Sequence, residues 1–279
     1  MNAPGPTPPP PRSGRRLTAL RLSAPSWRAG RVWRRNGRQG LRHWHTIVVP
    51  PLLEPLLYLA AFGAGVGRLI TDLEYGGVPV SYARYIAPAL VVVAAMYGSF
   101  FETSYSSFVR MFYQKIWDAM TATPLTLGDI LLGEVLWGAT RGMVGAVAVL
   151  VVVVAFGLVP LAATGPLLLA AATTALLFAA IGLLCTAALP TIDAFNYPIF
   201  LFLLPMFLFG ETFFPVAVLP AWAGRVATWT PLYHIMAMAR PAAFGTATPA
   251  DAWHLVAWLA ATPLLLLATH LFMARRLIQ

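Results

Sequence analysis

Ionisable side chains within apolar stretches are the residues of this sequence best placed to do chemistry. Glu54, Glu102, Glu134 and Glu211 supply carboxylates, and Arg141 supplies a guanidinium. A charge inside a membrane is costly, so such residues usually face the protein interior or water and mark a route for a substrate or a proton. Glu134 and Arg141 lie about 20° apart on a helical wheel, so both can face one interior. A structural ion pair, or helix ends that reach the membrane surface, explains the same pattern.

Glu211 and His234 belong to a segment, residues 211–250, that neither reads as one helix nor as a polar loop. Prolines divide it into short pieces at Pro215, Pro220, Pro231 and Pro241. Irregular backbone at membrane depth persists only where protein or water covers it. We therefore expect a re-entrant or interfacial helical hairpin on the outer side, with Glu211 and His234 as candidate gate residues.

Motifs for catalysis are missing from the sequence. The only lysine, Lys115, lies in QKIW and no GxxxxGK[ST] motif occurs, so the chain has no P-loop for a nucleotide. No GxSxG elbow is present, and the five histidines lack metal-ligand spacing apart from the pair His43 and His45, which its basic surroundings explain better. The sequence predicts a chain without enzyme activity, resident metal or cofactor.

The composition predicts an all-α polytopic membrane protein. Hydrophobic residues make up 59% of the chain and charged residues 10%, with a mean hydropathy of +0.72. Soluble domains carry about 25% charged residues, which excludes a soluble domain. Disordered chains combine low hydrophobicity with high charge, which excludes a disordered protein as well. A span needs roughly 20 apolar residues. We expect six spans, near residues 45–67, 85–108, 133–158, 166–189, 194–210 and 252–273.

The basic residues gather at one end of the chain. Ten of the 19 precede Glu54, which is the first acidic residue. Residues 1–25 read as a flexible Pro/Arg-rich cytoplasmic tail, residues 26–44 as an amphipathic interfacial helix, and residues 45–279 as the six-span domain. The positive-inside rule then places both termini in the cytoplasm. Because the basic block adjoins a transmembrane segment, membrane lipid explains it better than nucleic acid.

Residues 109–130 carry Arg110, Lys115, Asp118 and Asp129, too many charges for hydrocarbon, and predict a cytoplasmic loop. Its middle has the pattern of a short amphipathic helix that lies in a partner's groove. The apolar face would hold Ile116, Trp117 and Met120. The polar face, exposed to water, would hold Gln114, Lys115 and Asp118.

The order of these elements, with four sequence stretches, resembles a known family. The stretches are FETSYSSFVRM (101–111), WDAMTATPLTLGDILLGEVLW (117–137), FFPVAVLP (213–220) and PLYHIMAMAR (231–240). Over residues 26–275 the chain resembles the permease subunits of type 2 ABC exporters, and within them the nodulation-factor (lipo-oligosaccharide) exporter permeases. It departs from the pattern at Glu211, where a small residue is expected.

The resemblance implies a half-transporter of the bacterial plasma (inner) membrane. Two copies would form the pathway, and two copies of a separate ABC ATPase would bind ATP and Mg²⁺ and press on the coupling helix within residues 112–124. The substrate implied is a lipid-linked or lipid-modified oligosaccharide, an amphiphile that enters from the inner leaflet.

Three alternatives remain at this stage. The same machinery could export a hydrophobic drug or antibiotic. A proton-coupled carrier would use Glu54, Glu102, Glu134 and Arg141 as relay groups and need no ATPase, but the internal repeats typical of such carriers are not seen. A structural subunit of a larger membrane complex is the third.

Overall fold

The computed structural model describes residues 24–65, 73–75 and 78–278. Most of the predicted tail, residues 1–23, lies outside the described residues. The described chain is largely helical, apart from a short antiparallel hairpin of β1 (Glu74–Tyr75) and β2 (Val78–Pro79), in which Glu74 lies opposite Pro79. An all-α membrane protein is the class that the sequence predicted, and the helices bear it out.

Among the described residues, four helical runs are long and apolar enough to cross a membrane: Tyr82–Tyr113, Leu127–Ala155, Leu161–Ala188 and Ala252–Arg276. The first run consists of α4 (Tyr82–Phe101) and the π-helical segments η3 (Glu102–Ser106) and η4 (Val109–Tyr113). The others are built on α6 (Leu127–Ala155), α7 (Thr164–Ala188, after the 3-10 turn η5, Leu161–Ala163) and α12 (Ala252–Ile278).

The other two expected spans are helical but less regular. The first begins as α3 (Trp44–Tyr58) and continues as the π-helical η1 (Leu59–Gly65). The fifth is a shorter apolar run, Asp193–Phe209. That run consists of η6 (Asp193–Phe195), α8 (Asn196–Pro198), η7 (Ile199–Leu203) and α9 (Leu204–Phe209). The count of six spans therefore stays a prediction.

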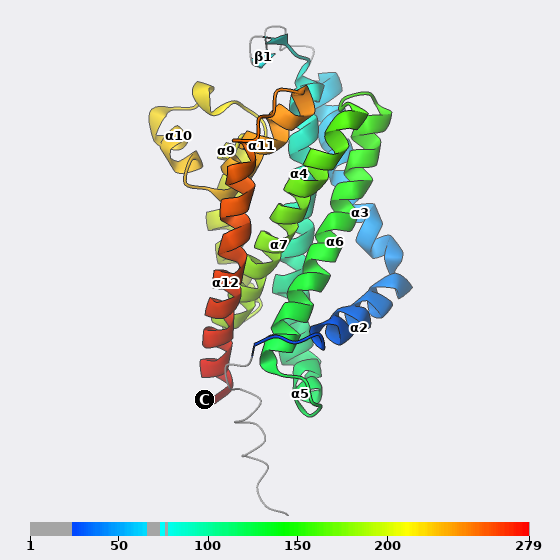
Figure 1. Ribbon diagram of the computed structural model, residues 1–279, viewed down its shortest axis with the longest axis vertical. Coiled ribbons are helices and arrows are strands. Elements are labelled where there is room, and N and C mark those ends of the chain that lie inside the picture. The colour runs from blue at the N-terminus through cyan, green and yellow to red at the C-terminus, as the bar shows by residue number, and fades with distance from the viewer. Residues whose placement is uncertain (1–23, 66–72, 76–77, 279) are drawn as a thin grey trace, which may run out of the picture.

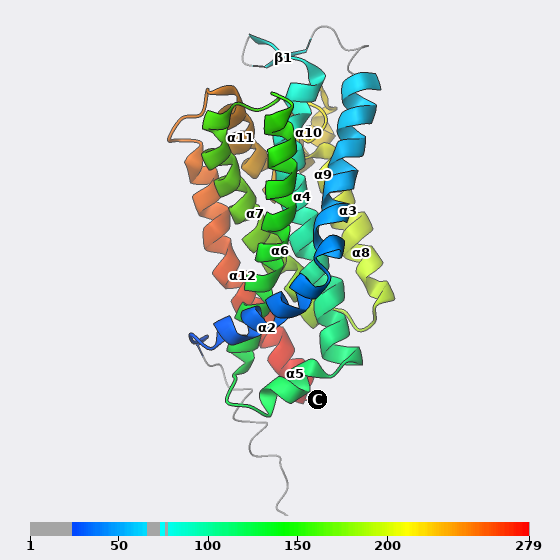
Figure 2. The ribbon, with the colours of Figure 1, turned by 90° about the vertical axis from the view of Figure 1, so that its right-hand side faces the viewer.

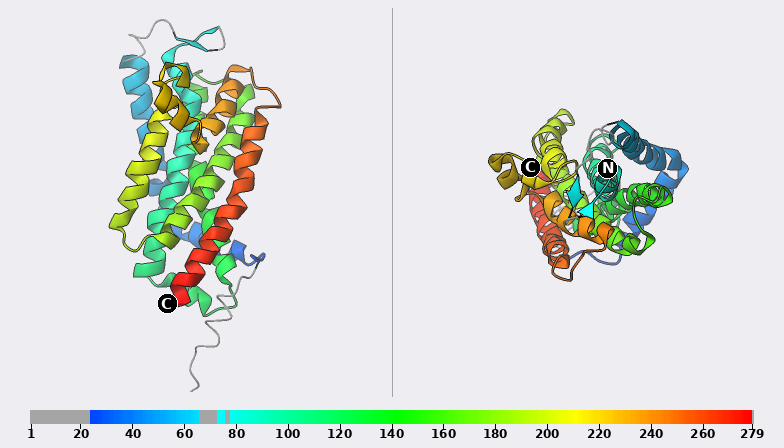
Figure 3. Two further views of the ribbon diagram at one scale, coloured as in Figure 1. Left: turned by 90° about the vertical axis from the view of Figure 1, so that its left-hand side faces the viewer. Right: turned by 90° about the horizontal axis from the view of Figure 1, so that it is seen from above.

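Helix α4 occupies the centre of the bundle. Alanine and β-branched residues cover all its sides, and it packs against α6, α7 and the outer helix α11 (Pro231–Phe244). Helix α12 lies at the edge of the bundle (Figure 3), packed along α7. Its side chains Leu264, Leu267 and Leu271 are exposed. A helix apolar on all sides suits the interior, whereas an apolar exposed face suits lipid or a second subunit.

The two ends of the molecule carry different elements. At one end lie α2 (Ala29–Arg42), the short helix α5 (Ile116–Thr121) and the C-terminus (Figure 1). At the opposite end lie the β-hairpin, α10 (Ala221–Ala227) and α11. Helix α2 crosses the bundle obliquely instead of running parallel to it (Figure 2).

Three prolines of residues 211–250 stand at helix boundaries, Pro215, Pro220 and Pro231, whereas Pro241 lies inside α11 and does not divide it as the sequence predicted. Pro220 is the N-cap of α10 and Pro231 the first residue of α11, where the missing N–H costs nothing. A 3-10 turn, η8 (Val216–Val218), precedes them. The result is two short helices at the end that carries the β-hairpin. Whether they re-enter the membrane stays a prediction.

The expectation of a loop over residues 109–130 was wrong at both of its ends. Residues 109–113 are the π-helical η4, and α6 already begins at Leu127, behind a capping box of Thr126 and Asp129. The charges tolerate burial because they have partners: Arg110 is paired with carboxylates, and Asp129 accepts hydrogen bonds from Ser26 and Thr126.

Candidate functional site

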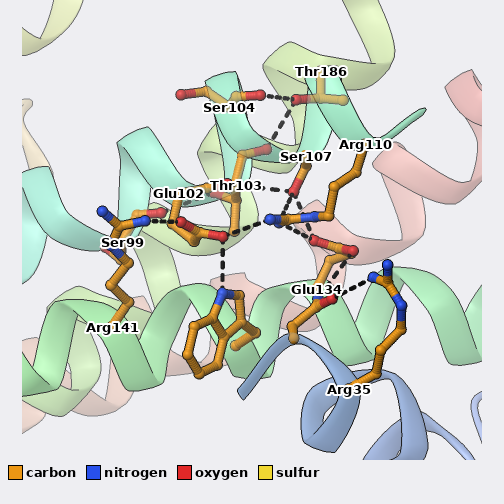
Figure 4. Close-up of polar contacts among 12 residues, drawn as sticks. Arg35, Ser99, Glu102, Thr103, Ser104, Ser107, Arg110, Glu134, Arg141 and Thr186 are labelled. Carbon is orange, nitrogen blue, oxygen red and sulfur yellow. Dashed lines mark hydrogen bonds and ion pairs between the residues drawn. The ribbon is translucent and has the colours of Figure 1, made fainter. Parts of the chain in front are cut away.

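Four charges meet between the π-helical end of the α4 run and α6 and form the charge cluster, three of them buried and the last half-buried: Glu102, Arg110, Glu134 and Arg141 (Figure 4). Arg110 Nη1 lies 2.7 Å from Glu102 Oε1, and its Nη2 lies 2.5 Å from Glu134 Oε2. Arg141 pairs with the other oxygen of Glu102. Glu134 is completely buried and Glu102 is 2% exposed. Two carboxylates and two guanidiniums make the cluster neutral, as buried charges require.

Neutral donors complete the coordination of both carboxylates. Trp137 Nε1 donates to Glu102 Oε1 over 2.8 Å, and Ser107 Oγ donates to Glu134 Oε2 over 2.8 Å. Asn36 Nδ2, from α2, donates to Glu134 Oε1 over 3.1 Å. The cluster therefore links three segments that are far apart in the sequence.

The π-helical turns bring Glu102 and Arg110 together. In a regular α-helix, residues eight apart point about 80° away from each other. A π-turn takes an extra residue per turn, which reduces this offset and is frequent at functional sites. Such turns also disturb the regular backbone bonding, and Thr186 of α7 donates to the carbonyls of Thr103 and Ser104 over 2.9 and 3.0 Å.

Helix α2 docks on α6 through glycines. A Cβ on Gly133 would lie 2.5 Å from Val32 Cβ, and a Cβ on Gly40 would lie 2.5 Å from the Trp137 ring. Val32 is 1% exposed as a result. Polar contacts fix the position of α2: Trp33 Nε1 donates to Thr140 over 2.9 Å. The predicted amphipathic segment is thus packed against the bundle, while Trp33, Leu41 and Trp44 stay exposed. Helix α2 covers the charge cluster and is held there by contacts with α6.

The predicted interior residues are mostly brought together. Glu102, Glu134 and Arg141 all join the charge cluster, yet Glu134 and Arg141 pair with other residues and not with each other. Glu54 lies in α3, and its side chain lies outside the described residues. Sequence reasoning missed Arg110, which it assigned to a loop. The signal was present, since Arg110 stands between apolar residues eight positions after Glu102.

Helix α5 presents a different face from the one predicted. Trp117 and Met120 are 3% and 7% exposed and belong to the core, so the expectation that they anchor a partner was wrong. Ile116 is half-buried. Gln114, Lys115, Asp118 and Ala119 are exposed. Lys115 has φ 53°, a left-handed turn that lets α5 fold back and direct its apolar side inward.

Glu211 is held by an ion pair at the opposite end. Arg240 is 1% exposed; its Nη1 lies 3.2 Å from Glu211 Oε2, and its Nη2 donates to the Glu211 carbonyl. The Arg240 guanidinium lies 4.0 Å above the Tyr85 ring, a cation–π contact. Glu211 has φ 60°, a strained conformation for this residue type. These contacts join the start of the outer segment to α11 and α4.

His234 joins α11 to α12. Its Nε2 donates to the Thr228 carbonyl over 2.9 Å, and its Nδ1 lies 3.1 Å from His254 Nδ1. Burial lowers the pKa of His234 and nearby His254 acts in the same direction, whereas the bond to Thr228 opposes them. Within the described residues, no group of three or more His, Cys, Asp or Glu side chains is placed to hold a metal ion.

Comparison with known proteins identifies the family. Residues 29–244 match the family described as ABC-2 type transporter, which is more than half of the chain. The chain belongs to the ABC-2 type transporter family. Members of this family are membrane subunits of transporters, which agrees with the four long apolar helices, and the family implies partnership with an ABC ATPase. The matched region contains the charge cluster, α5 and the outer ion pair.

Individual relatives of this ABC-2 chain carry a common name. The nodulation protein J of Rhizobium leguminosarum bv. trifolii is 34% identical over 233 residues, which cover 84% of this chain and 87% of the relative. The nodulation protein J of Rhizobium meliloti (strain 1021) is 30% identical over 231 residues, covering 83% and 87%. The resemblance drawn from the four sequence stretches is thereby confirmed.

Proposed function

We propose that this chain is the permease subunit of an ATP-driven exporter that moves a lipid-linked or lipid-modified oligosaccharide outward across the bacterial inner membrane. Two copies form the pathway, with both termini in the cytoplasm, and two separate ABC ATPases bind ATP and Mg²⁺. The resemblance to lipo-oligosaccharide exporter permeases supports this substrate class, as do the relatives named nodulation protein J. This chain itself holds no nucleotide.

The observation that carries the proposal is the exposed face of α5. Helix α5 projects at the end that also carries α2 and the C-terminus (Figure 1). Its outer face is polar, with Lys115 and Asp118 exposed, while Trp117 tethers the helix to the core. A helix fixed from within and polar outside transmits a push from a partner to the π-helical end of the α4 run and to α6, the two elements that meet in the charge cluster.

An exposed alanine at each end gives a matched test. Ala119→Arg places a long cation on the exposed face of α5, and Ala247→Arg does the same at the opposite end. After co-expression with the ATPase, we expect Ala119→Arg to reduce co-purification and ATP hydrolysis in lipid about tenfold, since a clash or unpaired charge in an interface costs at least 1.4 kcal/mol. Ala247→Arg should behave as wild type. Equal recruitment by both variants would remove α5 from the ATPase interface.

Transport itself separates the alternatives. In proteoliposomes containing the permease and the ATPase, ATP should drive a fluorescent lipo-oligosaccharide across the membrane, and a pH gradient without ATP should not. Movement driven by the pH gradient alone would favour the proton-coupled carrier. Stimulation of ATP hydrolysis by hydrophobic drugs, with none by the lipo-oligosaccharide, would favour drug export.

A further inference from the structure

A pocket of about 360 Å³ lies between α2, the π-helical segments and α6, beside the charge cluster. Its polar lining includes Asn36, Gln39, Tyr105, Ser106, Gln114 and Arg141. This volume is within the range of small-ligand sites, toward its lower end. Neither the family relationship nor the proposed export function assigns a ligand to it.

The pocket wall offers hydrogen-bond donors in excess of acceptors. Glu102 already accepts from Arg110, Trp137 and Arg141. Glu134 already accepts from three other donors, Asn36, Ser107 and Arg110. Both carboxylates of the charge cluster are therefore occupied. Few acceptors remain for a ligand that must donate hydrogen bonds, such as a sugar hydroxyl.

Surplus donors remain around the same pocket. Arg141 has five N–H groups, and its side chain is 29% exposed after pairing with Glu102. The side-chain amides of Gln39 and Gln114 are exposed at the pocket. Arg110 Nε is buried and has no hydrogen-bond partner among the described residues. A ligand rich in acceptor oxygens matches this set of groups.

Charge around the pocket is positive. The pocket lining sets one carboxylate, that of Glu102, against the guanidiniums of Arg110 and Arg141. Helix α2, which forms one wall, has no acidic residue and carries further arginines outside the lining: Arg35, Arg38 and Arg42. Phosphate carries the negative charge and the acceptor oxygens that such a wall selects. The exposed Trp33, Leu41 and Trp44 of α2 make the neighbouring surface apolar, so acyl chains fit beside the pocket.

We propose that this pocket binds the phosphate of an anionic phospholipid, whose head group sits under α2 while its acyl chains remain in the bilayer. The bound lipid supplies an acceptor for Arg141 and secures α2 over the charge cluster. This binding needs neither the ATPase nor a transported substrate, so its test stands apart from that of the export function.

The test measures lipid binding to the full-length chain in detergent. The purified protein is delipidated and titrated with phosphatidylglycerol or phosphatidylcholine, and bound lipid is counted by native mass spectrometry. We expect phosphatidylglycerol to bind about tenfold more tightly, because phosphatidylcholine carries a compensating cation next to its phosphate. Equal binding of the two lipids would overturn the proposal.

Variants locate the site. Arg141→Gln should remove the preference for phosphatidylglycerol, while Arg84→Gln, at an exposed arginine outside the pocket, should keep it. If Arg141→Gln does not fold, Ser106→Phe fills the pocket while every charged residue is kept, and it should give the same loss. A preference retained by a folded Arg141→Gln or Ser106→Phe protein would overturn the proposal.

Soluble probes identify the source of the phosphate. Neither sn-glycerol 3-phosphate nor inorganic phosphate should displace phosphatidylglycerol at millimolar concentration, because the acyl chains add affinity that these probes lack. Displacement by either would assign the pocket to a soluble phosphate compound instead of a lipid. Binding of N-acetylchitotriose, an uncharged sugar, with no binding of phosphatidylglycerol would overturn the phosphate assignment altogether.

Discussion

Arg110 bridges two carboxylates from different helices: its guanidinium lies 2.7 Å from Glu102 Oε1 and 2.5 Å from Glu134 Oε2. Glu102 precedes it in the same helical run, whereas Glu134 belongs to α6. Because both acids are buried, this arginine makes their burial tolerable and fixes the π-helical end of the α4 run to α6. The cluster thus connects the region next to α5 with the centre of the bundle.

Removing Arg110 should destabilise the fold strongly. Arg110→Gln leaves two buried carboxylates short of a counter-charge, and breaking a buried pair in this way costs about 3–5 kcal/mol. Thermal unfolding in detergent should show a much lower midpoint. Arg84→Gln, at an exposed position, should change stability by no more than about 0.5 kcal/mol. A similar midpoint for both variants would mean that the cluster contributes little to stability.

Close packing of α2 on α6 depends on Gly133. Gly133→Ala introduces a Cβ 2.5 Å from Val32 Cβ, so α2 must move, at a cost of about 1–3 kcal/mol. Gly30→Ala, inside α2, meets no atom within 4 Å and should stabilise the helix by about 0.5–1 kcal/mol. In both backgrounds a cysteine is placed at Val32. Faster labelling of that cysteine in Gly133→Ala alone is expected; equal rates would show that α2 is not held by this contact.

The charge asymmetry predicts the orientation in the membrane. In a Cys185→Ala background, a cysteine replaces Ala247 or Ala122, both of which are exposed, at opposite ends of the molecule. An impermeant maleimide added to intact cells should label Ala247→Cys and spare Ala122→Cys. Permeabilised cells should label both, which controls for reactivity. The reverse pattern in intact cells would place α5 outside and contradict the ATPase-docking assignment.

The His234–His254 contact should make the outer segment sensitive to acid. His234 Nε2 donates to Thr228, so neutral His234 presents Nδ1 as an acceptor and His254 Nδ1 must donate. Burial holds the pKa of His234 below its ordinary value of 6.5, with His254 acting alike and the Thr228 bond opposing them. Because the folded pKa is lowered, the unfolded chain binds more protons in this range. The contact therefore contributes its full stabilisation of the folded protein above pH 6.5. That contribution is lost as the pH falls through the lowered pKa that His234 has in the folded state.

Thermal unfolding measured from pH 8 to pH 5 checks this dependence. The wild-type midpoint should fall below pH 6.5, and His234→Gln should flatten most of that fall. His45→Gln, at an exposed position outside this contact, should leave it in place. An unchanged pH profile in His234→Gln would show that other groups cause the acid sensitivity.

Composition and local pattern determined the class of the protein and its family. An excess of apolar residues over lengths that match a bilayer leaves few solutions other than packed helices. The stretches around residues 101–137 and 213–240 were sufficient to recognise the ABC-2 relationship, because they are contiguous and need no knowledge of the packing. Rare charges in apolar surroundings pointed to Glu102, Glu134 and Arg141 for the same local reason.

Only the tertiary structure decided which charges pair and which faces are free. Helical periodicity gives the side of a helix on which a residue lies, but the neighbour that supplies the opposite charge depends on how helices pack, and the π-turns change the periodicity itself. Arg110 was assigned to a loop for that reason, and Glu134 binds it instead of Arg141. Trp117 and Met120 read as partner anchors because an apolar face looks the same whether it meets another subunit or its own core. The left-handed turn at Lys115, which directs that face inward, is a property of the folded backbone.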